Sequence, residues 1–206
     1  MDEIGAWIVA DGMGGYRDGD VASRMVCDAL ANFEAGKRIE DAIQSVRDRV
    51  SEVNRQLFKA ATRIVNPIVS GSTVAVLLAR RTSCAVLWAG DSRIYRLRHG
   101  RMTQLTTDHT WAAELNIQNA GEEADHAITR AVGGESVLSL DLRRDDVHIG
   151  DRFLLCSDGL THEIGDELIA ELLAHGGVGD SANALIDATL RAGARDNVTV
   201  VVVEAQ

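Results

Sequence analysis

Four aspartates in this sequence stand where an apolar run meets a glycine or another small turn residue. One acid in such a place is an ordinary turn residue, because Asp and Gly are both common in turns. Four in one chain predict that several strand ends bring carboxylates to the same place. The four segments are WIVADG with Asp11, VLWAGDSR with Asp91, FLLCSDG with Asp158 and ARDNVTVVVV with Asp196.

Carboxylates that converge in this way repel one another. Two unit charges about 4 Å apart interact by roughly 4 kcal/mol at an effective dielectric constant of 20, so the group must take up protons or bind cations. Carboxylates suit hard, oxygen-binding ions such as Mg²⁺ or Mn²⁺. Two such ions can lower the pKa of a bridging water and clamp a phosphate. The four acids therefore predict metal-assisted hydrolysis.

The rest of the pattern indicates which elements hold these acids. Apolar residues at helical spacing predict helices over residues 21–33 and 39–57, and again over 164–173 and 181–192. Between and after them lie short apolar runs that turn back on one another, which is typical of antiparallel strands. The order of elements favours an α+β fold, a β-sandwich of two mainly antiparallel sheets flanked by helices. The predicted strands include STVAVLLAR, SCAVLWAG, RIYRLRHG, RFLLC and NVTVVVVEA.

Composition narrows the class of protein. The net charge of −10 argues against nonspecific binding to nucleic acid or an anionic membrane. No apolar run is long enough to span a bilayer. The three cysteines, Cys27, Cys84 and Cys156, are scattered and lie in apolar runs, which predicts buried, reduced thiols and a cytoplasmic protein. Residues 1–206 are expected to form a single domain.

Seven motifs occur in an order that resembles the metal-dependent protein phosphatases (PPM, type 2C), and among them the bacterial serine/threonine branch. The resemblance runs from about Trp7 to Val203 and implies α-β-β-α layers with a binuclear Mn²⁺ or Mg²⁺ centre at one end. The motifs are VADGMGG, GSTVAVLLA, AGDSRIYRLR, LTTDHT, AITRAVGG, LLCSDGL and ARDNVTVVVV.

The resemblance also implies a role for each acid. Asp11 would bridge both metals, and the backbone carbonyl of Gly12 would bind the second. Asp158 and Asp196 match ligands of the first metal. Asp91 matches a ligand of a third, weaker metal, with Asp158 shared. A metal-activated water held by these acids would attack the phosphorus of phosphoserine or phosphothreonine in phosphoproteins, which would include a cognate Ser/Thr kinase or its substrates.

The sequence departs from the family pattern at its beginning. Family members normally carry two strands upstream of VADGMGG, with an arginine that contacts phosphate, and only six residues precede Trp7 here. The alternative is therefore a phosphatase-like binding or regulatory module with weak or no turnover. Residues 110–127 correspond to the variable flap of the family, and His162 stands where many members have Asp. A surface position is favoured for His162 over a role as a proton donor.

Overall fold

The structure is a computed structural model that describes residues 4–13, 18–31, 36, 38–62, 70–115, 117 and 127–206. Two four-stranded antiparallel sheets form its centre. The first has the order β1 (Gly5–Val9), β4 (Val74–Arg80), β5 (Ser83–Ala89) and β8 (Asp141–Asp146). The second has the order β10 (Val200–Glu204), β9 (Arg152–Cys156), β6 (Arg93–Arg98) and β7 (Arg101–Gln104). A short ladder joins β2 (Gly12–Met13) to β3 (Gly71–Ser72).

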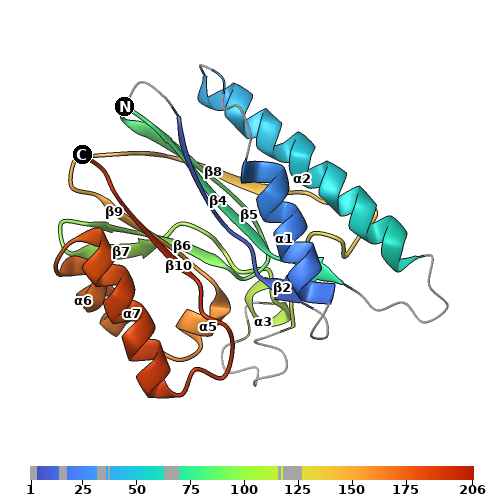
Figure 1. The fold of residues 1–206 in the computed structure, drawn as a ribbon. Coiled ribbons are helices and arrows are strands. Elements are labelled where there is room, and N and C mark those ends of the chain that lie inside the picture. The colour runs from blue at the N-terminus through green and yellow to red at the C-terminus, as the bar shows by residue number, and fades with distance from the viewer. Residues whose placement is uncertain are drawn as a thin grey trace.

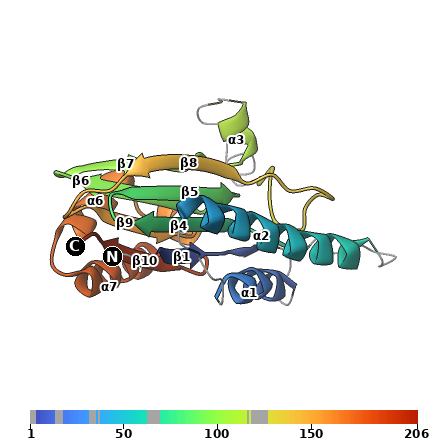
Figure 2. The same ribbon diagram turned by 90° about the horizontal axis from the view of Figure 1, so that it is seen from above.

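Helices cover the outer faces of the two sheets (Figure 1). The long helices α1 (Asp18–Ala31) and α2 (Ile39–Ala61) pack together on the first sheet. On the opposite side, α6 (Asp166–Ala174) and α7 (Val178–Ala192) pack on the second sheet. Of the two short helices, α5 (Asp158–Thr161) packs Leu160 into the core beneath α6 and α7, whereas α3 (Trp111–Glu114) lies outside these layers. Figure 2 shows α3 standing apart from both sheets.

Three apolar interfaces explain why the central strands are apolar throughout rather than alternating. In β4, Val74, Val76 and Leu78 face α1 and α2, whereas Ala75 and Leu77 face the second sheet. A strand with both faces buried needs apolar side chains at every position. The same holds in β9, where Leu155 lies between the sheets and Leu154 packs toward α6 and α7.

The predicted sandwich and its α-β-β-α layers are confirmed, and the strand runs lie where the sequence placed them. One prediction was wrong: Cys27 is exposed on α1, while Cys84 and Cys156 are buried. Val26 and Leu30 of α1 face the core, whereas the helix turns the thiol of Cys27 outward beside the exposed Asp28. Among the described residues, no helix has both the length and the apolar character that crossing a bilayer requires.

Candidate metal centre

The antiparallel order of the sheets carries the four predicted acids to one end of the sandwich. β1 and β5 both pair antiparallel to β4, so they run in the same direction and end together. Asp11 follows β1, and Asp91 follows β5. In the second sheet the end of β9 faces the start of β10, which places Asp158 beside the loop that contains Asp196. Residues far apart in the sequence therefore meet because of topology alone.

A buried hydroxyl fixes the loops of the first two acids relative to each other. The Oγ1 of Thr73 accepts a hydrogen bond from the backbone N–H of Asp11 at 3.0 Å and lies 2.7 Å from the Oγ of Ser92. The N–H of Thr73 donates to the Asp11 carbonyl at 2.8 Å. Gly90 approaches Thr73 so closely that a Cβ there would lie 2.7 Å from the Thr73 Cβ. Its φ of +106° is also a backbone conformation that glycine tolerates best.

The ionisation of these acids shows that they are close together. Burial, followed by the charge of Asp158 and a hydrogen bond with it, raises the pKa of Asp11 to about 7. The charges of Asp196 and Asp91 raise it further. Burial, and then the charge of Asp158, raise the pKa of Asp91 to about 7 as well. Asp158 thus interacts with both, and the protein holds negative charge here against a clear electrostatic cost.

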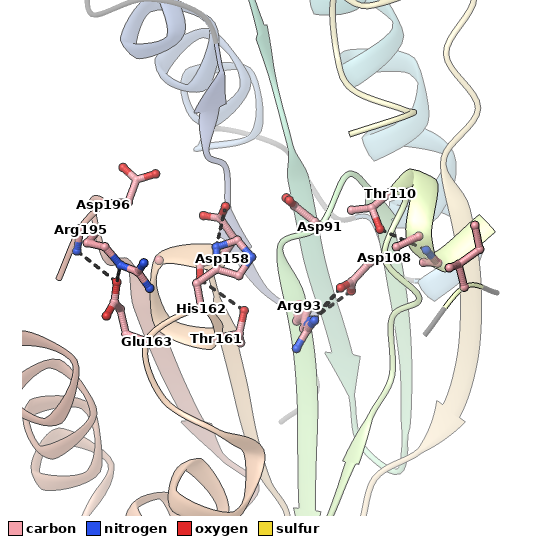
Figure 3. A pocket seen from close by; sticks show the side chains of 14 residues that line it. Asp91, Arg93, Asp108, Thr110, Asp158, Thr161, His162, Glu163, Arg195 and Asp196 are labelled. Atoms are coloured by element: carbon pink, nitrogen blue, oxygen red, sulfur yellow. Dashed lines mark hydrogen bonds and ion pairs between the residues drawn. The ribbon is translucent and has the colours of Figure 1, made fainter. Parts of the chain in front are cut away.

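A cavity of about 830 Å³ opens over this end of the sandwich. Three of the four acids line the cavity. Asp11 is not among the described lining residues, but it interacts with the lining residue Asp158. The cavity is far larger than a pair of ions requires, so it has room for a bound substrate. Two walls face each other across it (Figure 3). One is built by Thr110, Ala112, Ala113 and Ile117, the other by Thr161, His162, Glu163 and Arg195.

Sequence reasoning missed the charged pairs in these walls. Arg93 donates to both carboxylate oxygens of Asp108, at distances of 2.7 to 3.1 Å. Arg195 donates from its backbone N–H and its Nε to Oε1 of Glu163, at 3.2 and 2.9 Å. Arg195 directly precedes Asp196, so its place beside a predicted ligand was a usable signal. The partners Asp108 and Glu163 had none, because their contacts arise only in the folded chain.

His162 lies closer to the acids than expected. Its Nδ1 is 3.4 Å from Oδ2 of Asp158, one turn earlier in the chain. It is exposed, as predicted for a surface histidine, but it is exposed into the cavity rather than away from it.

The donors at this site fit a hard divalent cation. The Oδ1 of Asp158 is buried and has no hydrogen-bond partner in the described part of the chain, and a buried carboxylate oxygen without a partner is costly. Among the described residues, no group of three or more His, Cys, Asp or Glu side chains is arranged so that it could hold a metal by itself. Mg²⁺ typically binds through only one or two carboxylates and keeps several waters, so a paired set such as Asp11 and Asp158 is sufficient.

The individual metal roles of Asp11, Gly12, Asp91, Asp158 and Asp196 stay predictions. The structure brings Asp11 into electrostatic contact with each of the other three acids, and Asp91 with Asp158. Gly12 lies exposed in β2 opposite Ser72, and a Cβ at this position would collide with the backbone of Gly19. This position therefore needs glycine because of the close approach of α1.

Comparison with known proteins identifies the class. The family model for protein phosphatase 2C matches residues 2–195. The chain belongs to the protein phosphatase 2C family, which confirms the prediction made from the seven motifs.

Individual relatives agree with this assignment. The serine/threonine protein phosphatase PstP of Mycobacterium tuberculosis is 37% identical over 205 residues, which is 95% of this chain and 39% of PstP. This chain therefore spans well under half the length of that relative. A solved structure of PppA, described as a key regulatory component of T6SS in Pseudomonas aeruginosa, superposes with a TM-score of 0.92 at 36% identity, covering 98% of this chain and 86% of that one.

The catalytic domain of PstP has been solved in complex with two manganese ions. It matches with a TM-score of 0.85 at 34% identity and covers 99% of this chain and 91% of that one. The fold prediction is confirmed by these neighbours as well as by the layers themselves.

Proposed function

We propose that this protein is a metal-dependent phosphatase that removes phosphate from phosphoserine and phosphothreonine in proteins. One observation carries the proposal: three acids from strand ends line one cavity, a fourth, Asp11, interacts with all three, and Asp158 keeps a buried oxygen without a partner in the described part of the chain. An acidic site of this kind repels a phosphate unless cations are present. Membership of the phosphatase 2C family supports the same reaction.

The chain's own residues divide the work between binding and positioning. Asp11 and Asp158 supply carboxylate oxygens at the centre, and Asp196 and Asp91 add charge on either side. When bound, divalent cations supply a water of lowered pKa and neutralise the phosphate. Arg93 is held by Asp108 and Tyr95, so it shapes the wall of the cavity. Ala112, Ala113 and Ile117 offer an apolar surface to the peptide beside its phosphorylated residue.

Mn²⁺ or Mg²⁺ is the proposed cofactor, with two ions at Asp11, Gly12, Asp158 and Asp196. A third ion at Asp91 and Asp158 belongs to the proposal too. It is supported by the charge interaction of these two acids and by the raised pKa of Asp91.

The proposed partners are phosphoproteins, including a Ser/Thr kinase or its substrates. The three cysteines are free thiols, which supports a reducing compartment and hence the cytoplasm. We also propose that residues 1–206 act as one phosphatase domain.

The test is hydrolysis of p-nitrophenyl phosphate and of a phosphothreonine peptide with Mn²⁺ by wild-type protein and by Asp158→Ala. We expect turnover by the wild type only, and its loss when Mn²⁺ is chelated. Turnover that survives both changes contradicts the proposal. Calorimetry addresses the alternative, a binding module without turnover: such a module binds a phosphopeptide equally well with and without Mn²⁺.

A further inference from the structure

His109 joins the loop of Asp91 to the start of β8 and to the segment beside α3. The backbone N–H of Gly90 donates to the His109 Nδ1 at 3.1 Å, and the backbone N–H of His109 donates to the Gly90 carbonyl at 3.0 Å. Gly90 directly precedes Asp91, and it is wedged against Thr73. This double contact therefore sets where the carboxylate of Asp91 stands.

The other nitrogen of the same ring contacts the start of β8, which is linked to residues 127–130. The His109 Nε2 lies 3.3 Å from Oδ2 of Asp141, whose Oδ1 accepts from Arg130 at 2.6 Å. The His109 carbonyl accepts from the backbone N–H of Thr129 at 2.9 Å. Residues 127–130 in turn pair with the start of α3, where Ala127 accepts from the N–H of Trp111. The His109 side chain thus contacts the loop of Asp91 directly, and it reaches residues 127–130 through Asp141 and Arg130, while its backbone carbonyl binds Thr129.

The surroundings leave the imidazole of His109 one orientation and one tautomer. It is only 4% exposed and stacks on the indole of Trp88, with ring centroids 6.1 Å apart and planes 9° from parallel. Because Nδ1 accepts from Gly90, the proton stands on Nε2, which donates to Asp141. Burial and then the charge of Arg130 lower the pKa of His109, which favours this neutral form.

We propose that His109 is a positioning residue that couples the cation site at Asp91 to the wall formed by α3 and residues 127–130. This inference rests on the proposed function, because it assumes that a divalent cation binds at Asp91. It extends that function by linking cation affinity to the surface that receives the peptide. A purely structural histidine would instead support both regions without distinguishing between its two ring nitrogens.

Two substitutions separate the two nitrogens. His109→Asn places an amide oxygen near the position of Nδ1, so it can keep the Gly90 contact and loses Asp141. His109→Gln reaches the position of Nε2, so it can keep Asp141 and loses the acceptor for Gly90. The measurement is Mn²⁺ binding to the full chain by calorimetry, with Asp91→Asn identifying the site concerned. Because one hydrogen bond is lost, we expect His109→Gln to weaken that site about 5- to 10-fold.

The Asn variant should bind Mn²⁺ within about two-fold of the wild type, since one hydrogen bond separates the two variants. Its KM for a phosphothreonine peptide should rise while kcat changes less, because the side-chain link through Asp141 and Arg130 is cut and only the backbone bond to Thr129 is left. Asp141→Ala should behave in the same way, because it removes the acceptor of Nε2, and it keeps the histidine intact if neither His109 variant folds. Thermal midpoints of all variants serve as the control for folding.

Three results would overturn the inference. The first is wild-type Mn²⁺ affinity in His109→Gln. The second is a loss of Mn²⁺ affinity that is the same in both His109 variants and follows their loss of thermal stability. The third is an Asp91→Asn protein that binds as much Mn²⁺ as the wild type. Calorimetry does not require turnover. A protein that binds Mn²⁺ but hydrolyses nothing would refute the proposed function, and the Mn²⁺ affinities of the variants would still decide this inference.

Discussion

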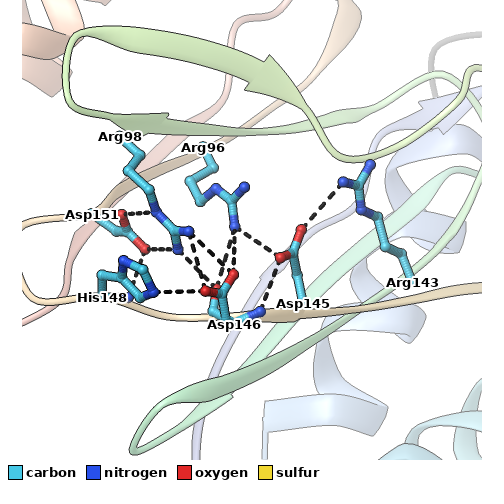
Figure 4. A network of polar contacts seen from close by, with 7 residues as sticks. All are labelled: Arg96, Arg98, Arg143, Asp145, Asp146, His148 and Asp151. Atoms are coloured by element: carbon cyan, nitrogen blue, oxygen red, sulfur yellow. Dashed lines mark hydrogen bonds and ion pairs between the residues drawn. The ribbon is translucent and has the colours of Figure 1, made fainter.

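Acidic residues gather in two regions of this protein, and the protein treats them in opposite ways. At the cavity, the strand-end acids Asp11 and Asp91 have raised pKa values because burial and neighbouring carboxylates act on them. Along β6 and β8, acids are instead interleaved with arginines in a network (Figure 4). The members of this arginine–aspartate network are Arg96, Arg98, Arg143, Asp145, Asp146, His148 and Asp151.

Asp151 shows the contrast most clearly. It is 1% exposed, and Arg98 donates to its two carboxylate oxygens from Nε and Nη2, each at 2.7 Å. Burial alone would raise the pKa of Asp151, but the hydrogen bonds from Arg98 and from the His148 N–H outweigh it and lower the pKa. Asp151 is held as a charged group by a matched cation, whereas Asp11 and Asp91 repel neighbouring carboxylates until a proton or a bound cation relieves the repulsion. The predictions below test this division.

The largest effect should follow loss of a strand-end acid. Asp11→Asn should lower kcat/KM at least about 100-fold, because it removes the carboxylate proposed to bind both metal ions. The free energy of unfolding of the metal-free protein should not fall, since the substitution also removes repulsion. Steady-state kinetics with Mn²⁺ and urea unfolding in chelator measure the two quantities. Asp145→Asn is the matched control and should keep its activity; a large loss of metal-free stability in Asp11→Asn would break the comparison.

Loss of a network arginine should have the reverse pattern. Arg98→Met leaves Asp151 buried with only the His148 N–H as partner, so we expect the free energy of unfolding to drop by about 2 kcal/mol. Mn²⁺ affinity should be unchanged. Urea unfolding measures the loss, with Arg143→Met as control. Arg143 makes a single 3.2 Å contact and is 40% exposed, so its loss should be within about 0.5 kcal/mol. Equal losses in the two variants would contradict the role assigned to Asp151.

The two regions should respond to pH with opposite signs. Asp11 and Asp91 take up protons near pH 7 in the folded protein but near pH 4 when unfolded. Their contribution therefore stabilises the metal-free protein as pH falls from about 7 to about 4. Asp151 has a lowered folded pKa, so its stabilisation is complete above its unfolded pKa and is lost as pH falls through the folded pKa.

Unfolding at a series of pH values in chelator measures both contributions. The double variant Asp11→Asn, Asp91→Asn should lose the gain between pH 7 and 4, and Arg98→Met should lose part of the decline below pH 4. Saturating Mn²⁺ should abolish the first gain, because protons and cations compete for the same oxygens. An unchanged gain in the double variant would show that other groups produce it.

The smallest effect is expected at an exposed pair that belongs to neither region. Arg144 contacts Glu40 at 2.8 Å, and both side chains are about half exposed. Solvent and salt screen such pairs, so Arg144→Gln should leave activity and the unfolding midpoint within experimental error. A clear loss of stability would mean that burial does not decide how much an ion pair contributes to the free energy of unfolding.

The candidate metal-binding acids and the layers of the fold could be predicted from the sequence, because both depend on the local pattern of apolar residues. Asp11, Asp91 and Asp158 follow strands whose apolar runs are visible in the sequence, and antiparallel pairing then brings their tips together. The motifs added the order of the strands. The local pattern does not show which side chains from distant segments contact each other in the folded chain.

His109, Asp141 and Arg130 form one contact group although up to 32 residues separate their ends. No periodicity in the sequence encodes such a group, because each contact exists only after β5 has paired with β8. The prediction that Cys27 is buried was wrong for a local reason. Met25, Val26 and Leu30 near it are apolar, but Asp28 is charged, and the rotation of α1 about its axis turns Cys27 outward together with Asp28.

β8 has a consequence beyond the contacts of its acids. It is one edge strand of the first sheet. Five of its six residues, in the sequence DLRRDD, carry charge. Charged margins resist the addition of a strand from another molecule. The opposite margin, β1, has the uncharged sequence GAWIV. Unwanted self-association during concentration or storage should therefore spread from β1, and one lysine introduced there should improve solubility more than any further charge on β8.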